Sequence, residues 1–299
     1  MNNNEIAASP ILIVTAVVAT LIMGTVPVLI KSVSANPVTI GLVRLVITVG
    51  LMSLILSIFF RSRFSTLRSM SNILGLTAIG VVFGFHWLSY FVSIKMSTAS
   101  LGAIGVSTFG IHLLILNWLI KGQKISLLNI LMIALCFIGC LLVVPEYSLS
   151  NSLTVGLCFG VLSGFFYACL PLLHQRVQHI DTVVRVWAQT AFAFLIFLPL
   201  SGQSEWNLSG DDWFKLLILG FFCTLVAHSL WVKASTELPG IVTSLIYYLY
   251  IPTAVVLSAI FLNEQINIKM IIGGSLILFS NIFQSLLSWR AYNIKMRNV

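Results

Sequence analysis

The chain has 299 residues, of which 59% are hydrophobic and only 8% are charged, and its mean hydropathy is +1.05. A soluble domain of this length cannot hide so much apolar surface, because a folded protein needs a largely polar exterior, so we expect lipid to be the outer solvent. The net charge of +8 does not indicate a nucleic-acid partner, because the basic residues gather in the joints between apolar segments.

Ten apolar segments follow one another along the chain, separated by short polar joints. A helix needs about 20 apolar residues to cross a hydrocarbon core of about 30 Å. The sequence therefore predicts an all-α integral membrane protein with ten transmembrane helices, five in residues 1–148 and five in residues 149–299. The expected spans are 10–30, 37–60, 72–94, 98–120, 126–145, 153–174, 182–200, 213–234, 239–262 and 268–288.

Basic residues divide unequally between the two sets of joints. With a cytoplasmic N-terminus and ten spans, eleven lie in cytoplasmic joints and four in outer joints. An excess of Lys and Arg is typical of the loops on the cytoplasmic side. Both chain termini are therefore predicted to be cytoplasmic, where basic side chains also attract anionic lipid. The eleven are Arg61, Arg63, Arg68, Lys121, Lys124, Arg176, Arg185, Lys233, Arg290, Lys295 and Arg297, and the four are Lys31, Lys95, Lys215 and Lys269.

The two sets of five spans resemble each other. Pro27 in the first span and Pro171 in the sixth are 144 positions apart, and His86 in the third and His228 in the eighth are 142 apart. The fourth and ninth spans end in similar residues, again at a separation of 142. An odd number of spans per repeat turns the second copy the other way up, so two inverted five-helix repeats are predicted, a construction used by many secondary transporters.

Four residues are expected to bend or gate their helices, namely Gly24, Pro27, Pro171 and Pro252. Proline removes a backbone hydrogen bond and clashes with the preceding turn. The carbonyl that it frees is tolerable against protein or a wet cavity but not against lipid, so the three prolines are predicted to face the bundle interior. A static kink that improves packing is the alternative to a gate.

Short sequence motifs occur in six of the expected spans. They are Gly24-Thr-Val-Pro27-Val-Leu-Ile-Lys31 with Pro37 and Arg44, His86-Trp87 with Phe91-Val-Ser-Ile-Lys95, Ser107-Thr-Phe109, Ala227-His228-Ser-Leu-Trp231, and Leu262-Asn-Glu264. In this order and spacing they resemble the EamA type of the drug/metabolite transporter superfamily, over essentially the whole chain. The resemblance implies ten helices in two inverted halves around a central cavity, which helices one, three, four, six, eight and nine typically line.

The chain departs from that family pattern at two places. Gly110 stands where the family often has proline, and Gly122 stands where it usually has the glutamate that closes helix four, although Glu264 keeps that glutamate in the second half. A mechanism that needs both glutamates is therefore in doubt here. The resemblance does not specify the solute, because members export amino acids, other metabolites or toxic compounds.

Nine residues are candidates for contact with a solute, namely His86, Trp87, Tyr90, Ser107, Thr108, Tyr167, His228, Trp231 and Tyr247. Histidine donates and accepts hydrogen bonds and can change charge near neutral pH, but it can equally be a neutral residue that ties two helices together. A tyrosine hydroxyl needs a partner, which water or solute in a cavity would provide. Serine and threonine hydroxyls can instead bond helix carbonyls.

Arg44 is the one basic residue expected about two turns inside a span, whereas the others stand in joints or at span ends, and no span contains a central Asp or Glu. We favour a structural role for Arg44, in which it bonds carbonyls of neighbouring helices or extends to the outer interface. A carrier of lipophilic cations would normally have an intramembrane carboxylate, so zwitterionic or neutral solutes are favoured. No ligand spacing indicates a metal, and no cofactor is expected.

The sequence thus predicts a secondary transporter, not an enzyme, that exports a small polar metabolite, such as an amino acid or a derivative, across the bacterial inner membrane by alternating access. Its direction follows from the family resemblance alone. Multidrug or toxic-compound efflux through the same fold is the alternative. The expected partners are the solute, membrane lipid and protons as a candidate coupling ion, in a monomer or a weak homodimer.

Overall fold

The computed structural model describes residues 10–122, 125–144, 148–238 and 240–297. Within these ranges every regular element is helical. The α-helices are α1 (Pro10–Gly24), α2 (Val26–Ser32), α3 (Pro37–Phe59), α4 (Met70–Met96), α5 (Ala99–Val106), α6 (Phe109–Lys121), α7 (Leu127–Leu142), α8 (Ser152–Arg176), α9 (Thr182–Phe197), α10 (Gly210–Ile218), α11 (Ala227–Glu237), α12 (Gly240–Tyr247), α13 (Tyr250–Phe261) and α14 (Ile268–Arg297). Two 3-10 segments, η1 (Arg61–Arg68) and η2 (Leu198–Gln203), and a π-helical segment, η3 (Leu219–Val226), connect or extend them.

Eight of the described helical segments are long and apolar enough to cross a bilayer. Two further apolar segments, Leu127–Val143 and Leu245–Phe261, are shorter, and they fall where the fifth and ninth spans are expected. The ninth, Leu245–Phe261, comprises the last residues of α12 together with α13. Helix length therefore supports eight crossings by itself, and the count of ten stays a prediction.

Polar caps account for where several helices begin. The side-chain oxygens of Asn36, Thr98, Asn151 and Asp181 accept a backbone hydrogen bond from the first turn of α3, α5, α8 and α9, respectively. Each cap satisfies one of the N–H groups that the start of a helix leaves unpaired. Within the helices, backbone N–H groups pair with carbonyls one turn earlier, as a hydrocarbon environment requires.

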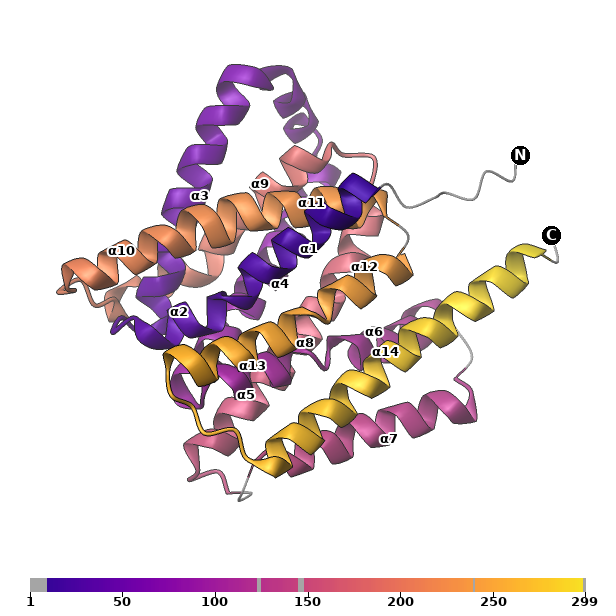
Figure 1. Cartoon of the computed structure of the whole chain (residues 1–299). Coiled ribbons are helices and arrows are strands. Elements are labelled where there is room, and N and C mark those ends of the chain that lie inside the picture. Colours follow the sequence, from indigo (N-terminus) through magenta and orange to yellow (C-terminus); the bar gives the residue numbers. More distant parts are fainter. Residues whose placement is uncertain (1–9, 123–124, 145–147, 239, 298–299) are drawn as a thin grey trace.

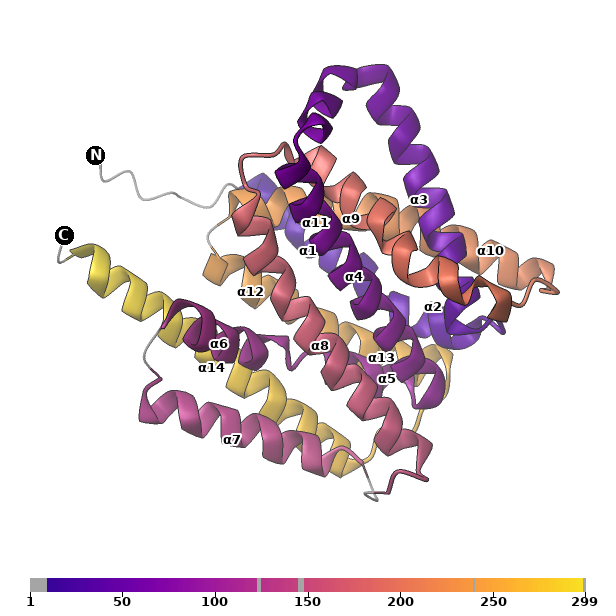
Figure 2. The same ribbon diagram turned by 180° about the vertical axis from the view of Figure 1, so that it is seen from behind.

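The helices of the two halves pack in exchanged pairs. The third predicted span, α4, packs on the sixth and seventh, α8 and α9, whereas the eighth, η3 with α11, packs on the second and first, α3 and α1. If a two-fold axis relates the halves, each contact of a first-half span with a second-half span has a counterpart in which the two halves change roles, and these pairs fit that pattern. The first residues of α1 and the last of α14 lie toward the same end of the bundle in both views (Figures 1 and 2), which suits an even number of crossings.

Helices α7 and α14 lie side by side at one edge of the bundle (Figure 1). They approach closely at Gly139 and Gly273, where a Cβ on Gly139 would lie 2.7 Å from the Gly273 carbonyl oxygen and one on Gly273 would lie 2.6 Å from the Gly139 oxygen. Small residues allow such backbone contact between membrane helices. The Asn281 side chain of α14 also accepts a hydrogen bond from Ile111 N at 3.0 Å, which caps the start of α6.

Three of the predicted spans are interrupted. Helix α1 gives way to α2 at Thr25, α5 to α6 at Ser107 and Thr108, and α12 to α13 at Tyr248 and Leu249. Ser107 and Leu249 are 142 positions apart, the same separation as the repeat-related histidines. Broken helices at corresponding positions of two halves are typical of transporter binding sites, because irregular backbone at membrane depth needs cover from protein or water.

The expected interior position is wrong for two of the three prolines. Pro27 is buried, but Pro171 and Pro252 are exposed, and α8 continues through Pro171. A proline ring is apolar and suits lipid, since only the carbonyl one turn earlier needs a partner or cover. For Pro252 that carbonyl belongs to Tyr248, which accepts a hydrogen bond from Ile251 N at 3.3 Å in a tighter turn.

Candidate functional site

Five aromatic rings from five helices meet beside the interruptions of the fourth and ninth spans. Tyr247 of α12 is at their centre, with ring centroids 5.3 Å from Tyr167 of α8, 5.2 Å from Trp231 of α11, 5.7 Å from Tyr250 of α13 and 5.1 Å from Phe109 of α6. The Tyr167 and Tyr250 rings are stacked on Tyr247, whereas Phe109 meets it edge-on. We call these five residues the aromatic cluster. Three of its members, Tyr167, Trp231 and Tyr247, were predicted from the sequence to contact a solute.

His86 of α4 joins the aromatic cluster to its own helix and to α8. Its ring lies 4.9 Å from Tyr167 and 6.1 Å from Tyr90. Its Nδ1 is 2.8 Å from Ser163 Oγ, and that hydroxyl donates to the His86 carbonyl at 3.0 Å. The Tyr90 hydroxyl is hydrogen-bonded to the Tyr250 hydroxyl. This geometry suits the alternative that the sequence left open, a histidine that ties two helices together.

The two repeat-related histidines both contact the ring of Phe83. The Phe83 ring is 6.0 Å from His86 and 5.8 Å from His228. Trp87, one turn after Phe83, is 6.0 Å from His228. The structure therefore brings the candidates His86, Trp87 and His228 together through a phenylalanine that was not among them.

Arg44 of α3 is buried beside the same rings, and of its two expected positions it takes the one against neighbouring helices. Its guanidinium carbon lies 4.1 Å from the Trp87 ring and 5.1 Å from the Phe91 ring, within the range of a cation–π contact. Its Nε donates to Thr224 Oγ1 at 3.0 Å, and Thr224 in turn donates to the Leu219 carbonyl five residues earlier in η3. Arg44 thus points into the bundle instead of toward the interface, because Trp87, Phe91 and Thr224 offer its cation partners there.

Ser107 and Thr108 lie at the helix interruption, but their hydroxyls bond their own helix. Ser107 Oγ donates to the Ile104 carbonyl at 2.6 Å, and Thr108 Oγ1 donates to the Gly105 carbonyl at 2.8 Å. The same two carbonyls also accept the backbone N–H groups of Ser107 and Thr108, each at 3.2 Å, so the hydroxyls add a second hydrogen bond at the end of α5. The structure supports the reading in which these hydroxyls serve the backbone.

The interruption of the first span lies against the ninth. A Cβ on Gly24 would come within 2.6 Å of Thr253 Cγ2 and 3.6 Å of the Tyr250 carbonyl oxygen, so only glycine permits this approach of α1 to α13. At the break itself, the Thr25 hydroxyl donates to the Ile22 carbonyl at 2.7 Å and so satisfies a carbonyl at the end of α1. The three interrupted spans therefore converge around the aromatic cluster.

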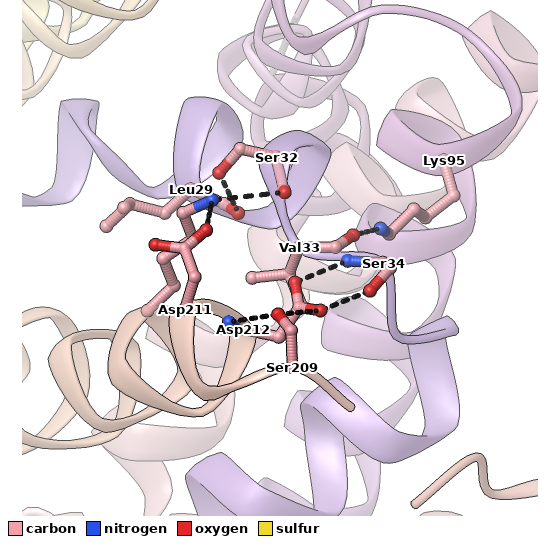
Figure 3. A network of polar contacts seen from close by, with 9 residues as sticks. Leu29, Ser32, Val33, Ser34, Lys95, Ser209, Asp211 and Asp212 are labelled. Carbon is pink, nitrogen blue, oxygen red and sulfur yellow. Dashed lines mark hydrogen bonds and ion pairs between the residues drawn. The ribbon is translucent and has the colours of Figure 1, made fainter. Parts of the chain in front are cut away.

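A polar network closes one end of the bundle, where α2 and α4 end and α10 begins (Figure 3). Asp212 accepts hydrogen bonds from Ser34 N at 2.9 Å, from the Ser34 hydroxyl and from Ser209 Oγ at 2.9 Å. Lys31 donates to the carbonyls of α4, and Lys95 donates to the Val33 carbonyl. We call the set Lys31, Ser34, Lys95, Ser209 and Asp212 the Lys31–Asp212 network.

Glu264 lies at the same end and caps α5. Its carboxylate accepts from Ala99 N at 2.6 Å, from Ser100 N at 3.1 Å, from Ser100 Oγ at 2.7 Å and from Ser258 Oγ at 2.9 Å. A carboxylate at a helix N-terminus is stabilised by these N–H groups and by the helix dipole. The glutamate that follows the ninth span therefore holds the start of the fourth.

In this conformation the candidate residues pack on one another. Two hollows of the structure lie elsewhere, one of about 410 Å³ beside the first turns of α1 and one of about 360 Å³ between α3, α4, α8 and η2. The rings of the aromatic cluster and the side chains of His86 and Trp87 occupy the region where the sequence predicts a central cavity.

Sequence reasoning missed four residues of this region: Phe83, Phe109, Ser163 and Tyr250. Phe109 and Tyr250 each begin the helix that follows an interruption, so the position of the break is the feature that points to these two residues. Phe83 precedes Trp87 by one helical turn. Ser163 gave no signal, because a serine in an apolar helix is common as a small packing residue.

Comparison with known proteins gives three findings. Residues 10–144 and 154–286 each match the sequence profile of a family described as the EamA-like transporter family. The chain is 23% identical over 216 residues to the "Uncharacterized transporter YxxF" of Bacillus subtilis (strain 168), across 69% of this chain and 70% of that protein. A solved crystal structure is similar with a TM-score of 0.63 at 14% identity, covering 92% of this chain and 98% of that one, which shows a likeness of fold.

Proposed function

Because the chain belongs to the EamA-like transporter family, we propose that it exports a small polar metabolite, an amino acid or a derivative, across the bacterial inner membrane by alternating access. A multi-pass membrane protein of this family is a transporter, which takes a small-molecule solute across a bilayer. The identity of the solute, the outward direction and the inner membrane are the proposed part.

The position of the aromatic cluster carries the proposal. The cluster lies where the interrupted spans converge, and it draws Phe109 from the first half of the chain and its other four members from the second half. Aromatic faces attract an ammonium group, and more strongly once water is excluded. The hydroxyls of Tyr167 and Tyr247 would hydrogen-bond the polar groups of the same solute.

The proposed architecture is two inverted repeats, residues 1–148 and 149–299, with ten spans. The exchanged packing of α4 with α8 and of α1 with α11 supports this arrangement. The corresponding interruptions of the fourth and ninth spans support it as well. In such transporters the two repeats move against each other around a site near the middle of the membrane.

The Lys31–Asp212 network would be the outer gate. It joins the ends of α2 and α4 to the start of α10, and Glu264 joins the end of α13 to the start of α5. These helices belong to spans that the family resemblance assigns to the cavity wall. With cytoplasmic termini, all of these ends face outward. The conformation described here is then one with the outer side closed, and export requires the network to separate.

Efflux of cationic drugs is less well supported by the same region. The described carboxylates lie at helix ends and in joints, far along the chain from the centres of the spans: Asp181, Glu205, Asp211, Asp212, Glu237 and Glu264. Arg44 adds a buried positive charge beside Trp87. A lipophilic cation would meet repulsion there and no intramembrane carboxylate.

Counterflow in proteoliposomes tests the proposal. Vesicles preloaded with each of the twenty unlabelled amino acids should take up the matching labelled amino acid in at least one case. Tyr247→Leu should lower that uptake about tenfold or more by removing the centre of the aromatic cluster, whereas Phe261→Leu, at an exposed ring, should leave it unchanged. Absence of exchange for all twenty, with and without a proton gradient, would overturn the proposed solute class, and uptake of ethidium instead would favour drug efflux.

A further inference from the structure

We propose that Arg44 binds the carboxylate of the transported solute, so that an anionic group is a requirement for transport. This inference rests on the proposed function and names the part of the solute that the site selects. It assigns a binding role to a residue for which the sequence alone favours a scaffold role.

The first observation is a buried guanidinium with unused donor capacity. Arg44 is only 1% exposed, and its Nη1 makes no hydrogen bond with any described residue. The two ion pairs among the described residues, Arg63 with Asp181 and Lys215 with Asp211, do not include it. A cation held inside a membrane bundle without a counter-charge is expensive, so it indicates a function at this position.

The second observation is that the protein offers Arg44 no carboxylate at membrane depth. The described Asp and Glu residues stand in joints and in the end turns of helices. A solute carboxylate would supply the missing negative charge, and its two oxygens match the planar fork of a guanidinium. The negative charge that pairs with Arg44 would therefore come from the solute.

The third observation is the position of Arg44 relative to the aromatic cluster. Trp87 lies under the guanidinium and is 6.0 Å from the His228 ring, and Phe83 connects His228 to His86, which contacts Tyr167 of the cluster. A solute with its carboxylate at Arg44 can thus place the rest of its body toward the cluster. The two recognition elements, a cation and a set of aromatic faces, suit a zwitterion.

The fourth observation is the π-helical segment that presents Thr224 to Arg44. The Thr224 hydroxyl donates to the Leu219 carbonyl at 2.7 Å while it accepts from Arg44 Nε at 3.0 Å. Such segments cost helix regularity and are frequent at functional sites. Thr224 orients the guanidinium through Nε, and this leaves Nη1 for another partner.

A structural explanation uses some of the same contacts. Arg44 could only hold α3 against η3, together with Thr48, whose hydroxyl donates to the Gly220 carbonyl at 3.2 Å. The two roles differ in one measurable property. A scaffold arginine affects all solutes equally, whereas a carboxylate-binding arginine distinguishes an amino acid from its carboxamide, which has the same shape and ammonium group but no negative charge.

The experiment compares those two molecules in proteoliposomes. The labelled amino acid that exchanges best in the counterflow screen is challenged with the unlabelled acid and with its carboxamide. On the wild-type protein the acid should compete at least about tenfold more strongly than the amide, the discrimination expected for one charged hydrogen-bonded pair. In Arg44→Gln the ratio should fall to about one, and in Arg44→Lys, which keeps the charge but not the fork, it should be intermediate.

Arg185→Gln is the matched control. Arg185 is also a buried arginine, but its donors have partners: the Ile180 carbonyl at 3.0 Å, the Thr182 hydroxyl at 2.8 Å and His174 Nδ1 at 3.5 Å. Its replacement should leave the acid-to-amide ratio unchanged. Gel filtration identifies folded variants, and if Arg44→Gln does not fold, the wild-type ratio and Arg44→Lys decide the question.

The outcomes separate this inference from the function on which it rests. Equal competition by acid and amide on a transporting wild-type protein would overturn the role of Arg44 and leave the proposed function intact. A ratio that survives in Arg44→Gln would do the same. Absence of exchange for every amino acid would remove the proposed function and this inference together.

Discussion

Lys31 and Lys95 each bind the end of the helix that carries the other. Lys31 Nζ donates to the carbonyls of Ile94 and Lys95, both at 3.1 Å, and to that of Ser97, where α4 ends. Lys95 Nζ donates to the Val33 carbonyl, the residue that caps the end of α2. The last carbonyls of a helix carry partial negative charge, so each lysine ammonium is attracted to the C-terminal end of the other lysine's helix. The first and third spans are thereby joined at one end of the bundle.

Asp212→Asn should loosen this end of the bundle. The change keeps the shape of the side chain but removes the charge that strengthens the hydrogen bonds from Ser34 and Ser209. A loss of about 1 kcal/mol, the difference between a charged and a neutral hydrogen bond, corresponds to roughly fivefold faster amide exchange at Ser34, measured by hydrogen–deuterium exchange in nanodiscs. Asp211→Asn is the control, because Asp211 is 69% exposed and pairs with Lys215 four residues later. Equal exchange in both variants would argue against a gate at Asp212.

Glu264→Gln should lower the stability of the folded protein. The carboxylate accepts four hydrogen bonds from Ala99, Ser100 and Ser258, and an amide cannot accept all of them through its nitrogen. Loss of a cap of this kind costs about 1–2 kcal/mol, to be measured by unfolding in SDS. Glu237→Gln, at an exposed position at the end of α11, should change stability by less than about 0.5 kcal/mol. A similar cost for the two variants would contradict the capping role.

Two glycine-to-alanine variants should have opposite effects. A Cβ on Gly105 would lie 2.8 Å from Gly160 Cα, a backbone atom that cannot turn aside, whereas a Cβ on Gly50 meets nothing within 4 Å. Gly105→Ala should destabilise the contact between α5 and α8 by about 1–3 kcal/mol through overpacking. Gly50→Ala should stabilise α3 by about 0.5–1 kcal/mol, because alanine loses less conformational entropy in a helix. The comparison is made by unfolding in SDS, and a stabilised Gly105→Ala protein would show that these helices separate easily.

His86 and Ser163 should behave as one unit in a double-mutant cycle. The ring nitrogen and the hydroxyl are 2.8 Å apart, and the hydroxyl also donates to the His86 carbonyl. His86→Ala and Ser163→Ala should each destabilise the protein, and the double variant should cost less than the two combined by about 0.5–3 kcal/mol. Unfolding in SDS of the four proteins measures this coupling. Strict additivity would mean that His86 does not use Ser163 as a partner, and would return it to the list of solute ligands.

Much of the fold could be predicted from residue order. The long apolar segments required a membrane, the expected spans 37–60, 98–120 and 153–174 begin within one residue of α3, α5 and α8, and the matching motifs of the two halves agree with two matches to the same family. These features are local, since the length of an apolar run and an N-cap each depend on a few neighbouring residues. The count of ten spans, the inversion of the repeats and the solute remain predictions.

The orientation of side chains could not be predicted in the same way. In a soluble protein, polar residues mark the exposed face of a helix, but here lipid and protein interior are equally apolar, so sequence alone does not say which face meets protein. Pro171 and Pro252 are therefore exposed where we expect burial. Arg44, for which we expect either carbonyls of neighbouring helices or the outer interface, is buried and bonds a threonine hydroxyl.

Apolar length and repeated motifs, which are properties of the chain alone, determined that this is a two-repeat membrane transporter. Only the packing of distant segments decided that Arg44 meets Trp87 and Thr224, and that Tyr247 gathers rings from four other helices. The physical reason is that a site made by several helices depends on their rotation and depth relative to one another, and contacts between the helices set both of these.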